Sequence, residues 1–98
     1  MSLGGYKSLI LNSAARVLVE AGVFLAVAAG NSADDAKYYS PASEDSVCTV
    51  GATDDTDNLA WFSNYGKGVD ILAPGVDVLS SWIGDTNSTV SLPISNVW

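Results

Sequence analysis

Asn31 stands at the end of an apolar run, VFLAVAAG, that narrows to small residues. Its side-chain amide can donate and accept hydrogen bonds, and Ala28, Ala29 and Gly30 before it leave a slot beside the backbone. In open parallel sheets, ligands bind beyond the carboxyl ends of the strands, which is where Asn31 lies if Val23–Ala28 is a strand. The Gly-Asn pair also suits an ordinary turn, since both residues tolerate positive φ. On these residues alone both interpretations stay open.

The sequence contains no histidine and one cysteine, Cys48. The lack of histidine removes the commonest general base and the commonest metal ligand together. A Ser-His-Asp arrangement therefore cannot be assembled from these residues. Cys48 cannot form an internal disulfide, and as a free thiol it would behave as a small apolar residue on a strand.

The balance of charge limits the partners of the chain. Its 98 residues carry a formal net charge of −7 with only four Lys and Arg residues. Four basic residues are too few for a basic patch, so we expect neither nucleic acid nor an anionic membrane as a partner.

The hydrophobic content of 48% and the nine glycines are typical of one globular domain. No apolar run approaches the roughly 20 residues of a transmembrane helix, and the start MSLGGYKS lacks the pattern of a signal peptide. We expect a monomer with no organic cofactor, and any export signal to lie outside this chain.

Hydrophobic periodicity predicts one helix and four short strands. Apolar residues recur at helical spacing in Tyr6–Ala21, and Gly22 follows where a helix commonly ends. Further β-rich runs are too short for helices and predict strands at Val23–Ala28, Val47–Ala52, Val69–Leu72 and Val76–Leu79. A helix between strands that are apolar enough to be covered on both faces predicts a parallel sheet of the α/β class. The polar segments Ser32–Ser43 and Thr53–Asp57 are expected to be surface loops.

Five blocks occur in one order and at one spacing that a known enzyme family shares. They are MSLGG (residues 1–5), FLAVAAGN (24–31), YYSPASEDSVCTVGATD (38–54), FSNYGKGVDILAPG (62–75) and VLSSWIG (78–84). Together they closely resemble the subtilisin-like serine proteases, and most closely the secreted fungal branch of proteinase K and the cuticle-degrading proteases. The resemblance covers residues 1–91 and implies a partial peptidase catalytic domain with an incomplete, parallel-sheet subtilisin-like α/β fold. We expect residues 92–98 to form a divergent tail that does not match these family blocks.

The resemblance implies a role for each residue around the first motif. In the family, the asparagine that closes the AAGN block donates its amide to the oxyanion hole, so Asn31 takes that role. The small residues Ala28, Ala29 and Gly30 then form a wall of the substrate pocket. The SLGG block implies an extended edge that pairs with the backbone of a peptide or protein substrate like an added strand, and the family residues carried over to it are Ser2, Leu3 and Gly4.

The same resemblance implies a structural calcium site. Its ligands would be the backbone carbonyls of Asp45 and Val47 and the carboxylate of Asp70, and carbonyl and carboxylate oxygens are the ligands that calcium prefers. The alternative is that Asp70 is only a polar residue at a strand edge. The acidic pair at Asp34 and Asp35 and the TDDTD segment are expected to be solvated loops.

Two further features agree with a secreted parent enzyme. By resemblance, Cys48 is a half-cystine whose partner lies in a missing C-terminal part. Asn87-Ser88-Thr89 is a glycosylation sequon, which is compatible with secretion.

The sequence departs from the family where catalysis would begin. The family's Asp and His blocks lie upstream of MSLGG, and its nucleophile block, GTSMA, is expected soon after Thr89, where the chain instead reads LPISNVW at residues 92–98. Ser95 is therefore not a nucleophile, because the glycine before it and the Met-Ala after it are missing. We expect an internal piece of a secreted serine endopeptidase that is inactive by itself. A catalytically dead peptide-binding pseudoenzyme or decoy is the alternative, and a small α/β binding domain ranks below it.

Overall fold

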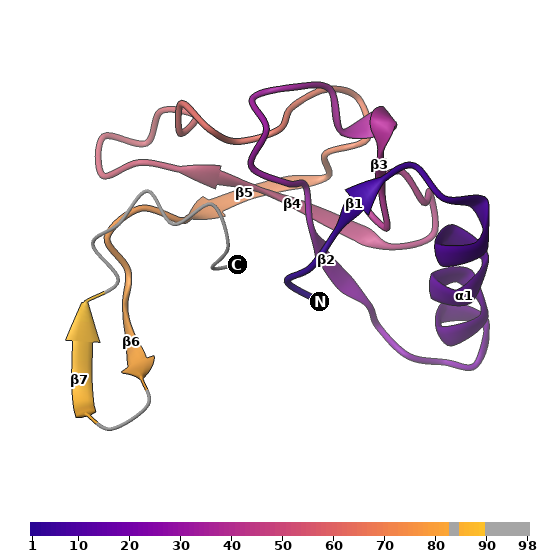
Figure 1. Cartoon of the computed structure of the whole chain (residues 1–98), viewed down its shortest axis with the longest axis horizontal. Helices are drawn as coiled ribbons and strands as arrows, with labels where there is room; N and C mark the ends of the chain where they lie inside the picture. Colours follow the sequence, from indigo (N-terminus) through magenta and orange to yellow (C-terminus); the bar gives the residue numbers. More distant parts are fainter. Residues whose placement is uncertain (83–84, 90–98) are drawn as a thin grey trace.

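The computed structural model describes residues 1–82 and 85–89, and its elements follow the order expected of an α/β chain (Figure 1). In chain order they are β1 (Gly5–Tyr6), α1 (Leu9–Glu20), β2 (Ala26–Ala28), the 3-10 helix η1 (Ala36–Tyr38), β3 (Tyr39–Ser40), β4 (Cys48–Thr53), β5 (Ile71–Pro74), β6 (Leu79–Trp82) and β7 (Asp85–Thr89). The predicted divergent tail, residues 92–98, and Ser95 within it lie outside the described residues, so the boundary after residue 91 stays a prediction. No helix in the described part of the chain is long and apolar enough to cross a membrane.

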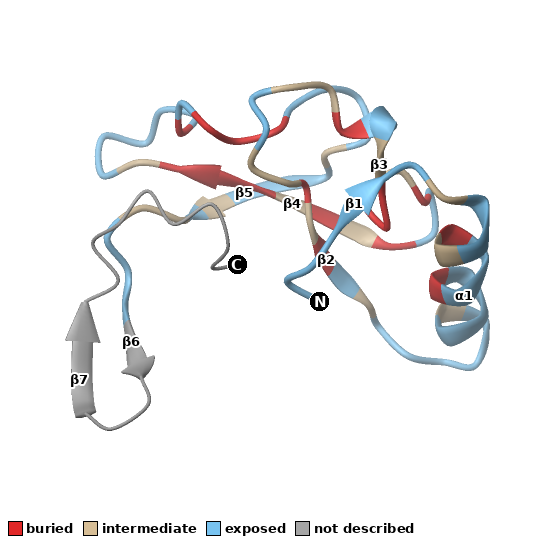
Figure 2. Ribbon diagram, in the orientation of Figure 1, coloured by how far each residue is buried: buried red, intermediate tan, exposed pale blue. Residues whose placement is uncertain are grey.

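The three strands β2, β4 and β5 form a parallel sheet in the order β2-β4-β5, which confirms the predicted parallel α/β class. Ala26 pairs with Cys48 and Val50 pairs with Ile71. The first residue extends this sheet past β2: the N-terminal amino group of Met1 donates to the Ala26 carbonyl, and the Met1 carbonyl accepts a hydrogen bond of 3.1 Å from the Ala28 N–H. β4 lies in the middle and carries most of the buried strand residues (Figure 2).

The helix α1 packs beside β2, and its ends have local causes. Ser8 caps it, because its Oγ accepts a hydrogen bond of 3.2 Å from the Leu11 N–H, and Gly22 follows its end at φ 92°. The buried face meets the sheet in a cluster of Ala15, Val27 and Val47. The helix starts at Leu9 instead of the predicted Tyr6 because the two residues of β1 pair antiparallel with β3.

Two predicted segments differ from the structure. The run Val76–Leu79 is not a strand: Asp77 has φ 55° in a bend, and β6 begins only at Leu79. The segment Ser32–Ser43 is only partly a surface loop, since its residues Ala36 and Ser40 are completely buried. Pairing with β1 draws this segment inward, and local polarity does not reveal such a long-range contact. The segment Thr53–Asp57 is the predicted surface loop from Asp54 onward, where it forms an exposed turn after β4.

A buried carboxylate ties α1 to the segment before β4. Glu44 accepts hydrogen bonds from Arg16 Nε at 3.1 Å and from an Arg16 guanidinium NH₂ group at 2.9 Å. Ser46 adds its backbone N–H and its hydroxyl to Glu44 Oε1. The hydrogen bonds from Arg16 lower the pKa of Glu44 below its ordinary value. Burial acts in the opposite direction, and the hydrogen bonds from Ser46 lower the pKa further. A charged Glu44 is therefore preferred in the folded state.

We expect Glu44→Gln to lower the free energy of unfolding by about 1.5 to 3 kcal/mol at neutral pH, because charge-assisted hydrogen bonds to a buried group are lost. Because the pKa of Glu44 is lower in the folded state, its ionised carboxylate stabilises the folded protein. This stabilisation is complete above the unfolded-state pKa, near 4.5, and is lost as the pH falls through the lower folded-state pKa. Thermal unfolding midpoints between pH 3 and 7 check this: the gap to the unmodified protein should shrink below pH 4.5. Asp55→Asn, in the exposed turn after β4, is the control. A gap that does not change with pH would contradict the assignment.

Candidate functional site

The seven predicted substrate-site residues meet at one cleft of about 600 Å³ beyond the carboxyl end of β2. The lining includes Ser2, Leu3, Gly4, Ala28, Ala29, Gly30 and Asn31. The sequence reasoning missed the rest of the lining, which comes from β1, from Ser32 and from the buried part of the segment after it: Gly5, Tyr6, Ser32, Tyr39, Ser40 and Ala42. Two chain segments that are more than twenty residues apart thus face each other across a hollow.

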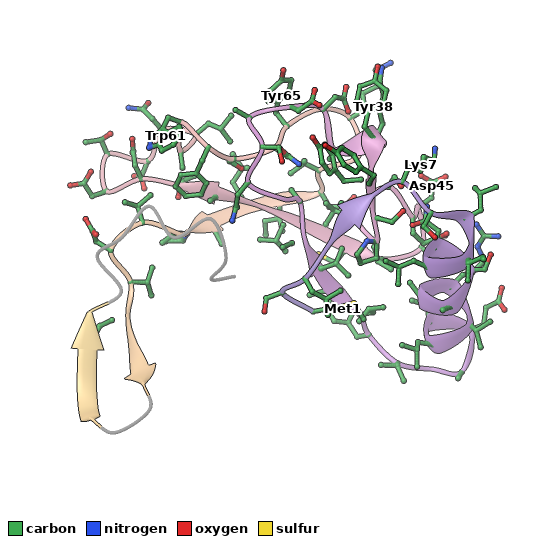
Figure 3. All side chains as sticks on the ribbon, viewed as in Figure 1. Met1, Lys7, Tyr38, Asp45, Trp61 and Tyr65 are labelled. Carbon is green, nitrogen blue, oxygen red and sulfur yellow. The ribbon has the colours of Figure 1, made fainter. Side chains whose placement is uncertain are left out.

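One wall of the cleft is an unused backbone edge. After Met1, which is hydrogen-bonded to β2 and lies beside it in Figure 3, the chain leaves the sheet as Ser2–Gly4. No hydrogen bond among the described residues uses a backbone N–H or C=O of this segment. A Cβ on Gly4 would stand 3.1 Å from the Ser40 carbonyl oxygen, so a side chain would crowd the wall there. An extended edge with free donors and acceptors can pair with an added strand.

The aromatic residues of the cleft lie on the paired strands β1 and β3, next to the Ser2–Gly4 wall. The rings of Tyr6 and Tyr39 stack with their centroids 6.0 Å apart. The Tyr39 hydroxyl donates to Asp34 Oδ2 at 3.2 Å, and the Ser8 N–H donates to Ser40 Oγ at 2.8 Å. These contacts fix the paired strands β1 and β3, which line the cleft.

The turn that presents Asn31 is made by Gly30 and not by Asn31. Gly30 has φ 106°, a conformation that favours glycine, whereas Asn31 does not take a positive φ. The Asn31 side chain is half-buried and forms no hydrogen bond with any described residue. It also borders a second hollow of about 20 Å³ next to Gly51 and Ala73, on the neighbouring strands β4 and β5. The amide thus lies at the edge where the strands of the parallel sheet end, as the sequence predicts.

A residue that the sequence reasoning gave no role, Asn64, holds this turn. Its side chain is completely buried, and its Nδ2 donates to the Ala29 carbonyl at 2.9 Å. Its Oδ1 accepts from the N–H groups of Ser32 and Asp34, at 2.9 and 3.1 Å. Asn64 stands in the FSNYG block, but no local pattern links it to a turn 30 residues earlier in the chain.

The three predicted calcium ligands are placed around the start of β4 and β5. Asp70 Oδ2 accepts a hydrogen bond of 2.7 Å from the Thr49 N–H, and the Asp70 N–H donates to the Thr49 carbonyl at 2.9 Å. The carbonyl oxygens of Asp45 and Val47 accept no hydrogen bond from the part of the chain that the structure describes. One carboxylate, together with two carbonyls that the described residues leave without a hydrogen bond, gives oxygen ligands of the kind that calcium prefers. Over residues 1–82 and 85–89, no group of three or more His, Cys, Asp or Glu side chains gathers for a metal.

The acidic segment after β4 has a structural role. Asp54 Oδ1 accepts hydrogen bonds from the N–H groups of Thr56 and Asn58 and from the Thr56 hydroxyl. The hydroxyl bond is the largest cause that lowers the pKa of Asp54. The Asp54 carboxylate therefore stabilises the exposed turn of which it is part. Trp61 follows on the same outer loop, is 78% exposed and does not line the cleft; Figure 3 labels its side chain.

Comparisons with known proteins agree on one family. A profile described as the subtilase family matches residues 1–96. The chain is 59% identical over 91 residues to the subtilisin-like serine protease AsES of Sarocladium strictum, with 93% of this chain and 24% of the relative covered. It is 62% identical over 82 residues to proteinase T of Parengyodontium album, with 84% of this chain and 28% of the relative covered. It is 61% identical over 89 residues to a cuticle-degrading protease of Metarhizium anisopliae, with 90% of this chain and 23% of the relative covered.

A solved structure agrees with these relatives. The crystal structure of a cold adapted subtilisin-like serine proteinase superposes with a TM-score of 0.89 at 44% identity, covering 93% of this chain and 33% of that chain. The chain therefore spans about a quarter of the length of the curated relatives it matches. The match of fold and sequence confirms the incomplete subtilisin-like fold and the resemblance to the proteinase K and cuticle-degrading branch. The chain belongs to the subtilase family.

Proposed function

We propose that this chain is part of the catalytic domain of a subtilisin-like serine endopeptidase, and that it supplies the oxyanion donor and two walls of the substrate cleft. The observation that carries the proposal is the meeting of Ser2–Gly4 and Ala28–Gly30 with Asn31 at one cleft. An amide that has no hydrogen-bond partner among the described residues, beside a backbone edge that they also leave unused, is what a peptide substrate needs for binding and polarisation.

In this proposal the Asn31 amide acts on the oxygen of the scissile carbonyl. That oxygen gains negative charge when a nucleophile attacks, and a donor already aimed at it stabilises the transition state more than the substrate. Removal of such an asparagine from subtilisin, itself a member of this family, costs about 2.7 to 4 kcal/mol of transition-state stabilisation. The free state of the Asn31 side chain among the described residues supports this role.

The substrate backbone would lie along the opposite wall. The N–H and C=O groups of Ser2, Leu3 and Gly4 are available to an extended peptide, while Ala28, Ala29 and Gly30 leave space for one of its side chains. The base of the triad would have to come from residues beyond these 98, since the sequence has no histidine. The nucleophile and the orienting carboxylate are proposed to come from there as well, since the family blocks that carry them do not occur in this sequence.

The proposal is tested by comparing the chain alone with a grafted domain, defined as a complete subtilase catalytic domain whose matching segment is replaced by residues 1–91 of this chain. We expect the chain alone to hydrolyse no peptide substrate and the grafted domain to hydrolyse it with sensitivity to a serine-directed inhibitor. Inhibitor-sensitive turnover by the repurified chain, or a folded grafted domain without activity, would overturn the proposal. Peptide binding by the chain without cleavage would instead support the pseudoenzyme alternative.

We also propose that Asp70 and the carbonyls of Asp45 and Val47 hold a structural calcium ion. At a calcium concentration about 100 times the dissociation constant, binding to the folded state alone adds roughly 2.7 kcal/mol of stability. We expect Asp70→Asn to abolish most of the rise in melting temperature that calcium gives the grafted domain, since a carboxylate ligand is lost while an oxygen acceptor for the Thr49 N–H is kept. Asp55→Asn, in the exposed turn after β4, is the control. An equal rise in both variants would remove Asp70 from the site.

An extracellular location completes the proposal. One relative is named as a cuticle-degrading protease, and cuticle is an extracellular material. The sequon at Asn87, on β7, is compatible with passage through a secretory pathway.

A further inference from the structure

We propose that Asn64 is a positioning residue for the oxyanion donor, in that its buried side chain fixes the turn from which Asn31 projects. This inference rests on the proposed role of Asn31. Asn64 comes from the loop between β4 and β5, 30 to 35 residues after the groups that it holds, and its side chain is completely buried.

The contacts of Asn64 lie on both sides of Asn31 and leave Asn31 itself free. Before it, Asn64 Nδ2 donates to the Ala29 carbonyl at 2.9 Å and the Asn64 N–H donates to the Gly30 carbonyl at 2.8 Å. After it, Asn64 Oδ1 accepts from Ser32 and Asp34. Four hydrogen bonds of one residue therefore fix the two arms of the turn, and the Asn31 side chain between them bonds to none of the described residues.

Only an amide of this length matches the pattern. The turn presents one carbonyl and two N–H groups to the same side chain, so it needs a donor and a doubly accepting oxygen at once. An aspartate at this position would keep the oxygen that accepts from Ser32 and Asp34. It would also place a negatively charged oxygen next to the Ala29 carbonyl oxygen, which would repel it. A serine has one hydroxyl and cannot reach all three groups. The fit is also close, since a Cβ on Gly30 would stand 2.4 Å from Asn64 Nδ2.

Asn64 is in turn anchored to the central strand. The Ser63 hydroxyl accepts a hydrogen bond of 3.0 Å from the Ala52 N–H in β4 and donates one of 3.0 Å to the Asn64 carbonyl. The Ala29 N–H donates to the Val50 carbonyl at 2.8 Å. The turn around Asn31, the buried Asn64 side chain and β4 thus form one hydrogen-bonded unit, which supports the Asn31 amide rigidly.

Rigidity matters because an oxyanion donor acts by being in place before the charge develops. A misplacement of about 1 Å can lower a rate by roughly 100-fold while the substrate still binds. Loss of the Asn64 amide is therefore expected to reduce kcat much more than it changes KM, and to act through Asn31.

The test is a double-mutant cycle in the grafted domain, with kcat expressed per molecule that titrates with an active-site reagent. We expect Asn64→Asp to lower kcat by about 10- to 100-fold with KM within about threefold. In the Asn31→Leu background the same change should lower kcat by less than about threefold, because the donor it positions is already gone. Asn58→Asp, an exposed asparagine in the turn after β4, is the matched control.

The outcomes separate this inference from the proposed function. Normal kcat in Asn31→Leu refutes the role of Asn31 itself. A low kcat in Asn31→Leu with normal kcat in Asn64→Asp, or losses that multiply in the double variant, overturns only the positioning role. Asn64→Ser, which is smaller and uncharged, repeats the test if the aspartate disrupts folding. If neither variant gives titratable domain at about 10 °C while Asn58→Asp does, Asn64 is a folding residue and the inference is wrong.

Discussion

Asn31→Leu is expected to lower kcat of the grafted domain by about 100- to 1000-fold and to leave KM nearly unchanged. Leucine is close to asparagine in size but has no donor, so the change removes the hydrogen bond to the developing oxyanion. That bond forms mainly in the transition state, and substrate binding should survive its loss. Steady-state kinetics on protein quantified by active-site titration give kcat for each folded molecule.

The alternative interpretation of Asn31 as a turn former predicts a different result. A turn former would act through stability, so the melting temperature would fall while each folded molecule kept its normal kcat. The structure weighs against this interpretation, because the positive φ belongs to Gly30 and Asn31 contributes no side-chain hydrogen bond to the described residues. A normal kcat in Asn31→Leu would remove the strongest support for the proposed function.

Gly30→Ala is expected to reduce both the stability and the activity of the grafted domain severely. A side chain at φ 106° is strained by about 1 to 3 kcal/mol. The new Cβ would also stand 2.4 Å from Asn64 Nδ2, and loss of the buried bond from Nδ2 to the Ala29 carbonyl adds about 1 to 3 kcal/mol. The free energy of unfolding should fall by roughly 2 to 6 kcal/mol in total, with kcat lowered in the remaining folded protein.

Gly68→Ala is the matched control for this change. Gly68 is exposed, has no positive φ, and a Cβ there would meet no atom of the described residues within 4 Å. Denaturant unfolding and kinetics on both variants check the prediction. If Gly30→Ala were as stable and as active as Gly68→Ala, the turn would be neither strained nor closely packed against Asn64.

Several elements could be predicted because their signals are local. The apolar run before Asn31 and the run at Val47–Ala52 predict buried strands, and β2 and β4 lie within or near them as parallel neighbours. The helical stripe predicts α1, although Ser8 and the pairing of β1 with β3 move its start to Leu9. The run Val76–Leu79 has the composition of a strand, but in this fold Asp77 forms a bend there.

The chemistry of the candidate site could be predicted before the fold was known, because small side chains, an amide donor and the order of five family blocks are properties of the residues and their spacing. Which residues meet in space depends on the path of the folded chain. The buried segment that closes the cleft reaches it through pairing with β1, and Asn64 reaches the Asn31 turn across sequence separations of 30 to 35 residues. Such contacts depend on where the chain returns after passing through the sheet. Periodicity and turn chemistry act over a few residues and carry no information about that return.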